Sequence, residues 1–195
     1  MMPINQKLIL ASESPRRRQL LAEAGFSFDV VSVKVSEIPD KNLNVNDQIL
    51  DIARRKARQS YADLKASRSD EFIVLSADTE VIWEGAPLGK PQDRNDAYRI
   101  LKLLSGNVHE VLTAVCMISS PSGRELSQVE TTKIFFKNLT DNEIWTYIDT
   151  KEPMDKAGAY GIQGLGGKFV EKYEGPFDNV VGLPISVVRD LLAKF

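Results

Sequence analysis

The chain has little of the residues that build thiol, histidine and zinc chemistry: one cysteine and one histidine among 195 residues. A single cysteine excludes an internal disulfide, and one cysteine with one histidine cannot complete the usual closed zinc site. Cys116 and His109 lie seven positions apart in the apolar stretch 108–118, which predicts a strand. The odd spacing puts them on opposite faces, about 23 Å apart at the rise of a strand, which disfavours a Cys–His dyad and leaves Cys116 for the core. Catalysis must then use carboxylates, lysines, arginines and a hard divalent metal that takes oxygen ligands.

The chain also lacks a large excess of either charge and any long apolar run. Lys and Arg number 25 against 27 Asp and Glu, which gives a formal charge of −2. This balance offers no general attraction for nucleic acid or an anionic membrane, so any anion site must be local. No apolar run approaches the roughly 20 residues of a membrane-spanning helix, and residues 1–6 lack the basic and apolar parts of a signal peptide. We therefore expect a cytoplasmic protein that folds as one domain or as two small lobes sharing a core.

Strand and helix patterns alternate along the chain without repeats or low-complexity segments, which predicts an α/β or a mixed α+β fold. Expected N-caps are Ser14, Asn46 or Asp47, and Thr140, the last in a Thr-x-x-Glu capping box. Strands are expected at residues 8–11, 28–33, 72–77, 81–83, 108–118, 129–136 and 168–173, and helices at residues 15–24, 47–66, 93–104, 141–152 and 184–193.

Three consecutive arginines, residues 16–18, fall in the first turn of a predicted helix, because Ser14 suits the N-cap and Pro15 the first helical position. The helix macrodipole disfavours cations there, and the free backbone N–H groups already attract anions. A bound polyanion would relieve this conflict. The alternative is a surface helix whose arginines point into water.

Two further charged residues occupy positions that suit a site. Asp78 follows the apolar stretch 72–77, and ligands of open α/β sheets bind beyond the carboxyl ends of strands. The alternative is that Asp78 belongs to a turn or a helix cap. Lys56 shares an apolar stripe of its helix with Ile52 and Ala53. Either its ammonium group reaches solvent over a buried stem, or it faces an anion.

Loops supply the remaining candidates. Five glycines occur within residues 158–167, which favours either a ligand-facing loop or an awkward turn between core elements. Lys90 lies in a predicted turn. Glu37 and the pair Glu152 and Asp155 offer oxygen ligands for a metal, although acids in loops are usually just solvated.

Taken in order, seven stretches of the chain resemble the Maf family of nucleoside triphosphate pyrophosphatases. The resemblance implies a two-lobed α/β fold like that of the inosine triphosphate pyrophosphatases, with an elongated mixed β-sheet. It implies one Maf-like domain over residues 1–195, whose lobes flank a central substrate cleft. The stretches are residues 12–17, 55–57, 77–79, 89–91, 104–113, 152–164 and 179–184, and they span nearly the whole chain.

The resemblance also implies a reaction, the hydrolysis of a nucleoside triphosphate between its α and β phosphates with Mg²⁺ or Mn²⁺. By matching motif, Asp78 would be the catalytic carboxylate, as general base or metal ligand. Glu37 would help to place the metal, with Asp40 as the alternative. The residues implied for substrate binding are Ser12, Arg16, Arg17, Lys56, Thr79, Lys90 and Gln163.

Two of these motifs, residues 77–79 and 159–164, resemble the branch of the family that acts on dTTP and UTP, with modified pyrimidine nucleotides as further candidates. The amide of Gln163 can donate to O4 and accept from N3–H of thymine or uracil. The alternatives are the 7-methyl-GTP specificity of the other branch and a nucleotide-binding regulator of cell division or septum formation. The family suggests a homodimer, with no stable nucleic-acid or membrane partner.

Overall fold

A computed structural model describes residues 6–195, so the segment compared above with a signal peptide lies almost wholly outside the described residues. The strands are β1 (Lys7–Ala11), β2 (Phe28–Val31), β3 (Phe72–Trp83), β4 (Ala86–Pro87), β5 (Val108–Ser119), β6 (Arg124–Phe136) and β7 (Val170–Glu174). The helices are α1 (Pro15–Glu23), α2 (Val45–Ser67), α3 (Arg94–Leu104), α4 (Asp141–Asp149), α5 (Phe177–Val181) and α6 (Ile185–Leu192). Three short 3-10 helices, η1 (Glu152–Asp155), η2 (Ala157–Ala159) and η3 (Leu165–Phe169), follow α4.

The strands form a mixed sheet in the order β2-β1-β3-β5-β6-β7, with β4 paired to β3. β1 runs parallel to both β2 and β3, whereas the β3–β4 and β6–β7 pairs are antiparallel. The predicted α/β class and mixed sheet are therefore confirmed. The chain divides into two compact units. The first holds the described residues up to Asp78 with Thr113–Glu130 and Gly182–Phe195, and the second holds Thr79–Leu112 and Thr131–Val181.

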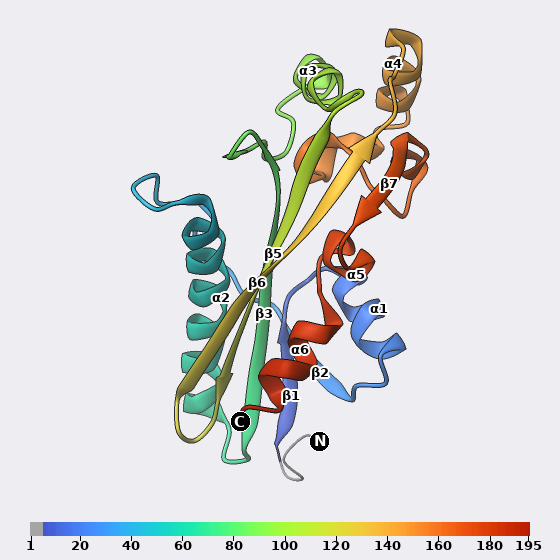
Figure 1. The fold of residues 1–195 in the computed structure, drawn as a ribbon. Helices are drawn as coiled ribbons and strands as arrows, with labels where there is room; N and C mark the ends of the chain where they lie inside the picture. The colour runs from blue at the N-terminus through green and yellow to red at the C-terminus, as the bar shows by residue number, and fades with distance from the viewer. Residues whose placement is uncertain (1–5) are drawn as a thin grey trace. The chain divides into compact units, whose positions relative to one another are not determined.

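The first unit packs helices on both faces of its strands. Leu8 of β1 aligns with Ile73 of β3 in parallel register, and both are fully buried in a cluster that includes Leu21 of α1 and residues of α6. On the other face, the hydroxyl of Ser76 donates to the carbonyl oxygen of Ala53 in α2, at 2.7 Å. Figure 1 shows α2 along one side of these strands and α1 with α6 on the other. Strands covered on both faces read as continuous apolar runs, as residues 8–11 and 72–75 do.

The second unit has its own core, built around the apolar face of α3. That face was predicted from its spacing, and all four of its residues, Ala97, Ile100, Leu101 and Leu104, are fully buried. Aromatic rings pack edge-to-face against each other in the same core: Phe136 lies 4.8 Å from Tyr160, and Tyr147 lies 5.0 Å from Phe169, between ring centroids. Each unit therefore has an apolar centre of its own.

Several predicted boundaries are wrong, and two of them concern the elements that carry Lys56 and Asp78. Helix α2 is capped by Asn44 rather than Asn46 or Asp47, because the Asn44 side chain reaches the backbone N–H of Asp47 at 3.0 Å. Strand β3 does not end before Asp78 but continues to Trp83, so Asp78 lies inside a strand and belongs neither to a turn nor to a helix cap. The strand can carry this carboxylate because Lys56 lies next to it.

The other predicted helix starts agree with the structure. Ser14 caps α1, with Pro15 at the first helical position, and Asp93 caps α3. Strand β6 begins earlier than predicted, and the short helix α5 was not predicted. Within residues 6–195, no helix is both long and apolar enough to cross a membrane.

The capping box of α4 is complete and gives a first test of this architecture. Thr140 Oγ1 accepts from the backbone N–H of Glu143, and the Glu143 carboxylate accepts from the backbone N–H of Thr140 at 2.8 Å. Replacing an N-cap threonine by alanine costs about 1 kcal/mol. We expect Thr140→Ala to lower the free energy of unfolding by about this amount in urea denaturation, and Thr140→Ser to lower it less.

The stability that Thr140→Ala loses should be smaller at acid pH. The hydrogen bond from the Thr140 side chain lowers the pKa of Glu143, so the stabilisation is present above the ordinary pKa of a glutamate and is lost as pH falls through the lowered value. The difference between wild type and Thr140→Ala should therefore narrow in acid. Equal losses in the alanine and serine variants would assign the effect to the threonine methyl group instead.

Candidate active site

The first unit contains a group of polar residues, Ser12, Arg17, Glu37, Lys56 and Asp78, which we call the polar cluster. At its centre, two carboxylates share one lysine. Lys56 Nζ lies 2.8 Å from Asp78 Oδ1 and 2.6 Å from Glu37 Oε1. The Lys56 and Asp78 side chains are 10% and 12% exposed, whereas Glu37 is exposed. A lysine whose ammonium reaches open solvent is therefore excluded, because the charged end of Lys56 lies between acids of the same chain.

The regular spacing of side chains along helix α2 and strand β3 brings Lys56 and Asp78 together. Ser76 bonds to Ala53 of α2, and Asp78, two residues further along β3, points to the same face of the strand. Lys56 lies three residues after Ala53 and thus on the same side of the helix. Ile52 and Ala57 are buried on that side too, so apolar packing fixes the helix that carries the lysine.

Arg17 turns inward from the start of α1. Its Nε donates to the carbonyl oxygen of Gly182 at 2.9 Å, and its Nη1 donates to Ser12 Oγ at 3.3 Å. Ser12 is buried and also accepts from the backbone N–H of Ser14. Burial lowers the pKa of Arg17, and the negative charge of Asp78 partly opposes that shift, so Arg17 lies within electrostatic reach of the Lys56–Asp78 pair.

The other two arginines of this turn, Arg16 and Arg18, are exposed. The alternative of arginines that point into water therefore holds for Arg16 and Arg18 but not for Arg17, and the bound polyanion stays a prediction. Arg17 is built into the polar cluster, and its neighbours face water. Among the residues predicted for the first unit, the structure thus brings together Ser12, Arg17, Glu37, Lys56 and Asp78.

The second unit holds the remaining predicted residues, Thr79, Lys90 and Gln163. Thr79 follows Asp78 on β3 and is half-buried, whereas Lys90 and Gln163 are exposed. The backbone N–H of Gly158 donates to the carbonyl oxygen of Gly89 at 2.9 Å, which joins the turn before Lys90 to the start of the glycine-rich segment.

Only glycine fits at this junction. Gly158 has φ of +68°, and a Cβ atom there would lie 2.8 Å from the side-chain carbons of Val81. Both the backbone conformation and the close approach therefore require the missing side chain.

Two acids that the sequence offered as metal ligands have other partners. The Glu152 carboxylate accepts from the backbone N–H of Leu165 at 3.0 Å and of Gly166 at 3.2 Å. Asp155 pairs with Lys156 at 2.7 Å. Within residues 6–195 there is no group of three or more His, Cys, Asp or Glu side chains placed to hold a metal ion. The acids of the polar cluster that remain for a metal are Glu37 and Asp78.

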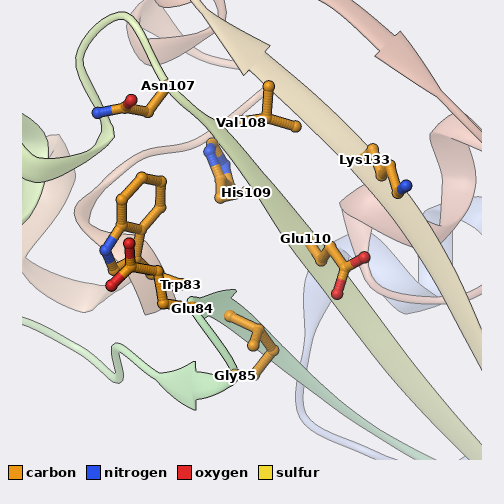
Figure 2. Close-up of a pocket in the computed structure, with 9 residues that line it drawn as sticks. Trp83, Glu84, Gly85, Asn107, Val108, His109, Glu110 and Lys133 are labelled. Atoms are coloured by element: carbon orange, nitrogen blue, oxygen red, sulfur yellow. The ribbon is translucent and has the colours of Figure 1, made fainter.

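A pocket of about 470 Å³ lies in the second unit, and the sequence analysis did not find it. Figure 2 shows its lining: Trp83, Glu84 and Gly85 come from the β3–β4 hairpin, residues 107–110 from the start of β5, and Lys133 from β6. Small-molecule pockets typically measure about 300–1,000 Å³. Gly85 of the hairpin was the one local feature of the sequence that pointed to this region. Nothing in the sequence shows that these parts of β3, β5 and β6 come together.

The single histidine and the single cysteine are both buried and uncharged near neutral pH. Burial lowers the pKa of His109 to about 3 and raises the pKa of Cys116 to about 12. The His109 ring instead contacts the Tyr160 hydroxyl, with 2.8 Å between Nε2 and the oxygen. The core position predicted for Cys116 is confirmed, and neither residue has the pKa of a base or nucleophile.

The chain is similar to known proteins over nearly its whole length. The family model described as Maf-like protein matches residues 7–195. A dTTP/UTP pyrophosphatase from Bdellovibrio bacteriovorus is 76% identical over 188 residues, which cover 96% of this chain and 98% of that protein. A dTTP/UTP pyrophosphatase from Acetivibrio thermocellus is 45% identical over 192 residues, covering 97% and 95%.

Among solved structures, a nucleoside-triphosphatase, or dITP/XTP pyrophosphatase, from Mycobacterium abscessus covers 96% of this chain and 92% of its own. It is 15% identical, with a TM-score of 0.41, which is too low to establish a common fold. The family assignment rests instead on the sequence matches, which run from β1 to the last residue. By these matches, the chain belongs to the Maf family.

Proposed function

We propose that this chain is a nucleoside triphosphate pyrophosphatase that hydrolyses dTTP and UTP to the monophosphate and pyrophosphate. The observation that carries the proposal is the buried Lys56–Asp78 pair with Arg17 within its electrostatic reach, in a chain 76% identical to a dTTP/UTP pyrophosphatase. Such a group combines an acceptor for a proton with cations for phosphate oxygens. Hydrolysis of a phosphoanhydride needs both.

The chemistry assigns a role to each charge. Water attacks the α-phosphorus in line with the leaving pyrophosphate, so one side of the reaction needs a proton acceptor and the other needs positive charge. Asp78 offers the carboxylate that accepts the proton. Arg16, Arg17 and Lys56 neutralise the charge that develops on the leaving group, with Ser12 as a further polar contact. Lys90 stays a predicted substrate contact. No thiol or imidazole is required.

A divalent cation fits the donor set of the polar cluster. Mg²⁺ at a phosphate substrate is usually bound by one or two carboxylates, with substrate and water oxygens completing the shell. Glu37 and Asp78 are two carboxylates that lie within hydrogen-bond distance of one ammonium group, so they can also serve one cation. These residues would hold Mg²⁺ or Mn²⁺, which when bound supplies charge neutralisation at the phosphates.

The pyrimidine preference depends on Gln163 in this proposal, with Thr79 as a second contact. Gln163 is exposed on the glycine-rich segment, so its amide is not part of the packed core. A side-chain amide offers both a donor and an acceptor, which matches the O4 and N3–H edge of thymine and uracil. The single-domain arrangement, the homodimer and the cytoplasmic location stay predictions.

The direct test is a substrate screen with product analysis. The protein is incubated with Mg²⁺ and dTTP, UTP or 7-methyl-GTP, and phosphorus NMR identifies the products. We expect dTTP to give dTMP and pyrophosphate, with dTTP and UTP preferred over 7-methyl-GTP. Orthophosphate with dTDP would rule out the mechanism, and a preference for 7-methyl-GTP would refute the assigned specificity.

Replacing Asp78 tests the proton acceptor. Asp78→Asn keeps the size of the side chain but removes its charge, and we expect kcat to fall by about 10²- to 10⁴-fold because general base catalysis is lost. Binding of dTTP, measured by calorimetry, should persist. Asp63→Asn, at an exposed position of the same long helix that carries Lys56, is the matched control and should keep full activity. Full activity in Asp78→Asn would dismiss this residue as the base.

Replacing Glu37 tests the metal assignment. EDTA should abolish turnover, and Mg²⁺ or Mn²⁺ should restore it. Calorimetric titration of Mn²⁺ into the protein with Glu37→Gln should show affinity about tenfold weaker, because a site of two carboxylates loses one charged ligand. Asp40→Asn is the control, since Asp40 caps its own loop at Asn42. If Asp40→Asn weakened Mn²⁺ binding and Glu37→Gln did not, the ligand would be Asp40.

A further inference from the structure

One carboxylate holds the backbone on the C-terminal side of Gln163. Glu152 Oε2 accepts from the N–H of Leu165 at 3.0 Å, and Oε1 accepts from the N–H of Gly166 at 3.2 Å. These hydrogen bonds, together with the one from the Tyr147 hydroxyl, outweigh the effect of burial and lower the pKa of Glu152. The carboxylate is therefore charged at neutral pH, where hydrogen bonds to it are strongest.

Tyr147 extends the same network to the N-terminal side of Gln163. Its hydroxyl donates to Glu152 Oε1 at 2.9 Å and accepts from the N–H of Gly161 at 3.2 Å. The ring is buried and packs edge-to-face against Phe169. Burial raises the pKa of Tyr147, so the hydroxyl keeps its proton and stays a donor. The chain is thus tied down two residues before Gln163 and two and three residues after it.

Two glycines of this loop lie against these anchors. A Cβ atom on Gly164 would lie 2.4 Å from Glu152 Oε1, and one on Gly166 would lie 2.6 Å from the Tyr147 hydroxyl oxygen. Neither glycine has a positive φ. At these two positions the loop therefore favours glycine because the backbone approaches Glu152 and Tyr147 closely, not because of its torsion angles.

We propose that Glu152, acting with Tyr147, is a positioning residue that fixes the backbone around Gln163 and thereby sets the preference for a pyrimidine base. The inference rests on the proposed function, in which Gln163 contacts the base. A side chain can select a base by hydrogen bonds only if its backbone is held within a fraction of an ångström, since small displacements weaken the bonds steeply.

A double-mutant cycle tests this proposal. Selectivity is the ratio of kcat/KM for dTTP to that for GTP, measured by pyrophosphate release. Gln163→Ala should lower it about tenfold, the order expected for the net loss of one hydrogen bond to one substrate. Glu152→Gln should lower it to a similar extent, mainly through KM for dTTP, because an amide cannot accept at both positions. The double variant should match Gln163→Ala alone, because both changes act through one contact.

Two further variants control for stability and charge. Tyr147→Phe keeps the ring but removes the hydroxyl that joins Glu152 to Gly161, and it should reproduce the loss of selectivity if Glu152→Gln folds poorly. Asp149→Asn removes a nearby exposed charge, paired with Arg94, and should leave selectivity unchanged. Circular dichroism of each variant establishes that it is folded.

Three results would overturn the proposal: equal loss of kcat/KM on dTTP and GTP in Glu152→Gln, additive losses in the double variant, or unchanged selectivity in Gln163→Ala. Failure of the proposed function has a different signature, since it appears in the wild type as dTTP binding without pyrophosphate release. In that case the same cycle is run on the dissociation constants for dTTP and GTP, and the same three outcomes decide it.

Discussion

A carboxylate buried in the middle of a sheet strand needs a nearby cation, and Lys56 provides it for Asp78. Their charged atoms lie 2.8 Å apart, with both side chains nearly buried. Removing one partner from such a pair costs about 3–5 kcal/mol, because the other charge is left buried and uncompensated. The lysine belongs to α2, so α2 must pack on β3 in the register that the Ser76–Ala53 hydrogen bond also sets. The fold of the first unit and the chemistry of its polar cluster therefore depend on the same contact.

The cluster also places a second cation, Arg17, within electrostatic reach of its two acids, Glu37 and Asp78. Burial lowers the pKa of Arg17, and the negative charges of Asp78 and Glu37 oppose that shift. The negative charge of an incoming phosphate would act on Arg17 in the same direction as Asp78. The free energy that Arg17 loses on burial can thus be recovered when an anion binds, which favours a polyanionic substrate over a neutral one. A chain of formal charge −2 can do this because the positive charge is local.

Sequence reasoning found features that depend on local spacing and missed those that depend on distant partners. The caps at Ser14 and Thr140 and the apolar face of α3 were predicted, because each follows from residues within one or two helical turns. The extension of β3 through Asp78 was not, since the cation that allows it comes from 22 residues earlier. Lys56 itself was found, because a lysine on an apolar stripe is anomalous in any helix. The apolar stripe does not show that Glu37 and Asp78 are its partners.

The glycine-rich segment shows the same limit most clearly. Its composition fits either a loop shaped by positive φ or a backbone in close contact with something else, and the sequence cannot separate these. The structure distinguishes the two cases. Gly158 has a positive φ and also lies close to Val81, whereas Gly164 and Gly166 have no positive φ and lie close to Glu152 and Tyr147. A loop held by contact keeps its shape only while its partner is present, whereas a loop held by torsion angles keeps it alone. The backbone hydrogen bond from Gly164 to Gly161 closes a turn around Gln163, and two side chains outside the segment hold that turn in place, so any selectivity that resides there depends on them as well.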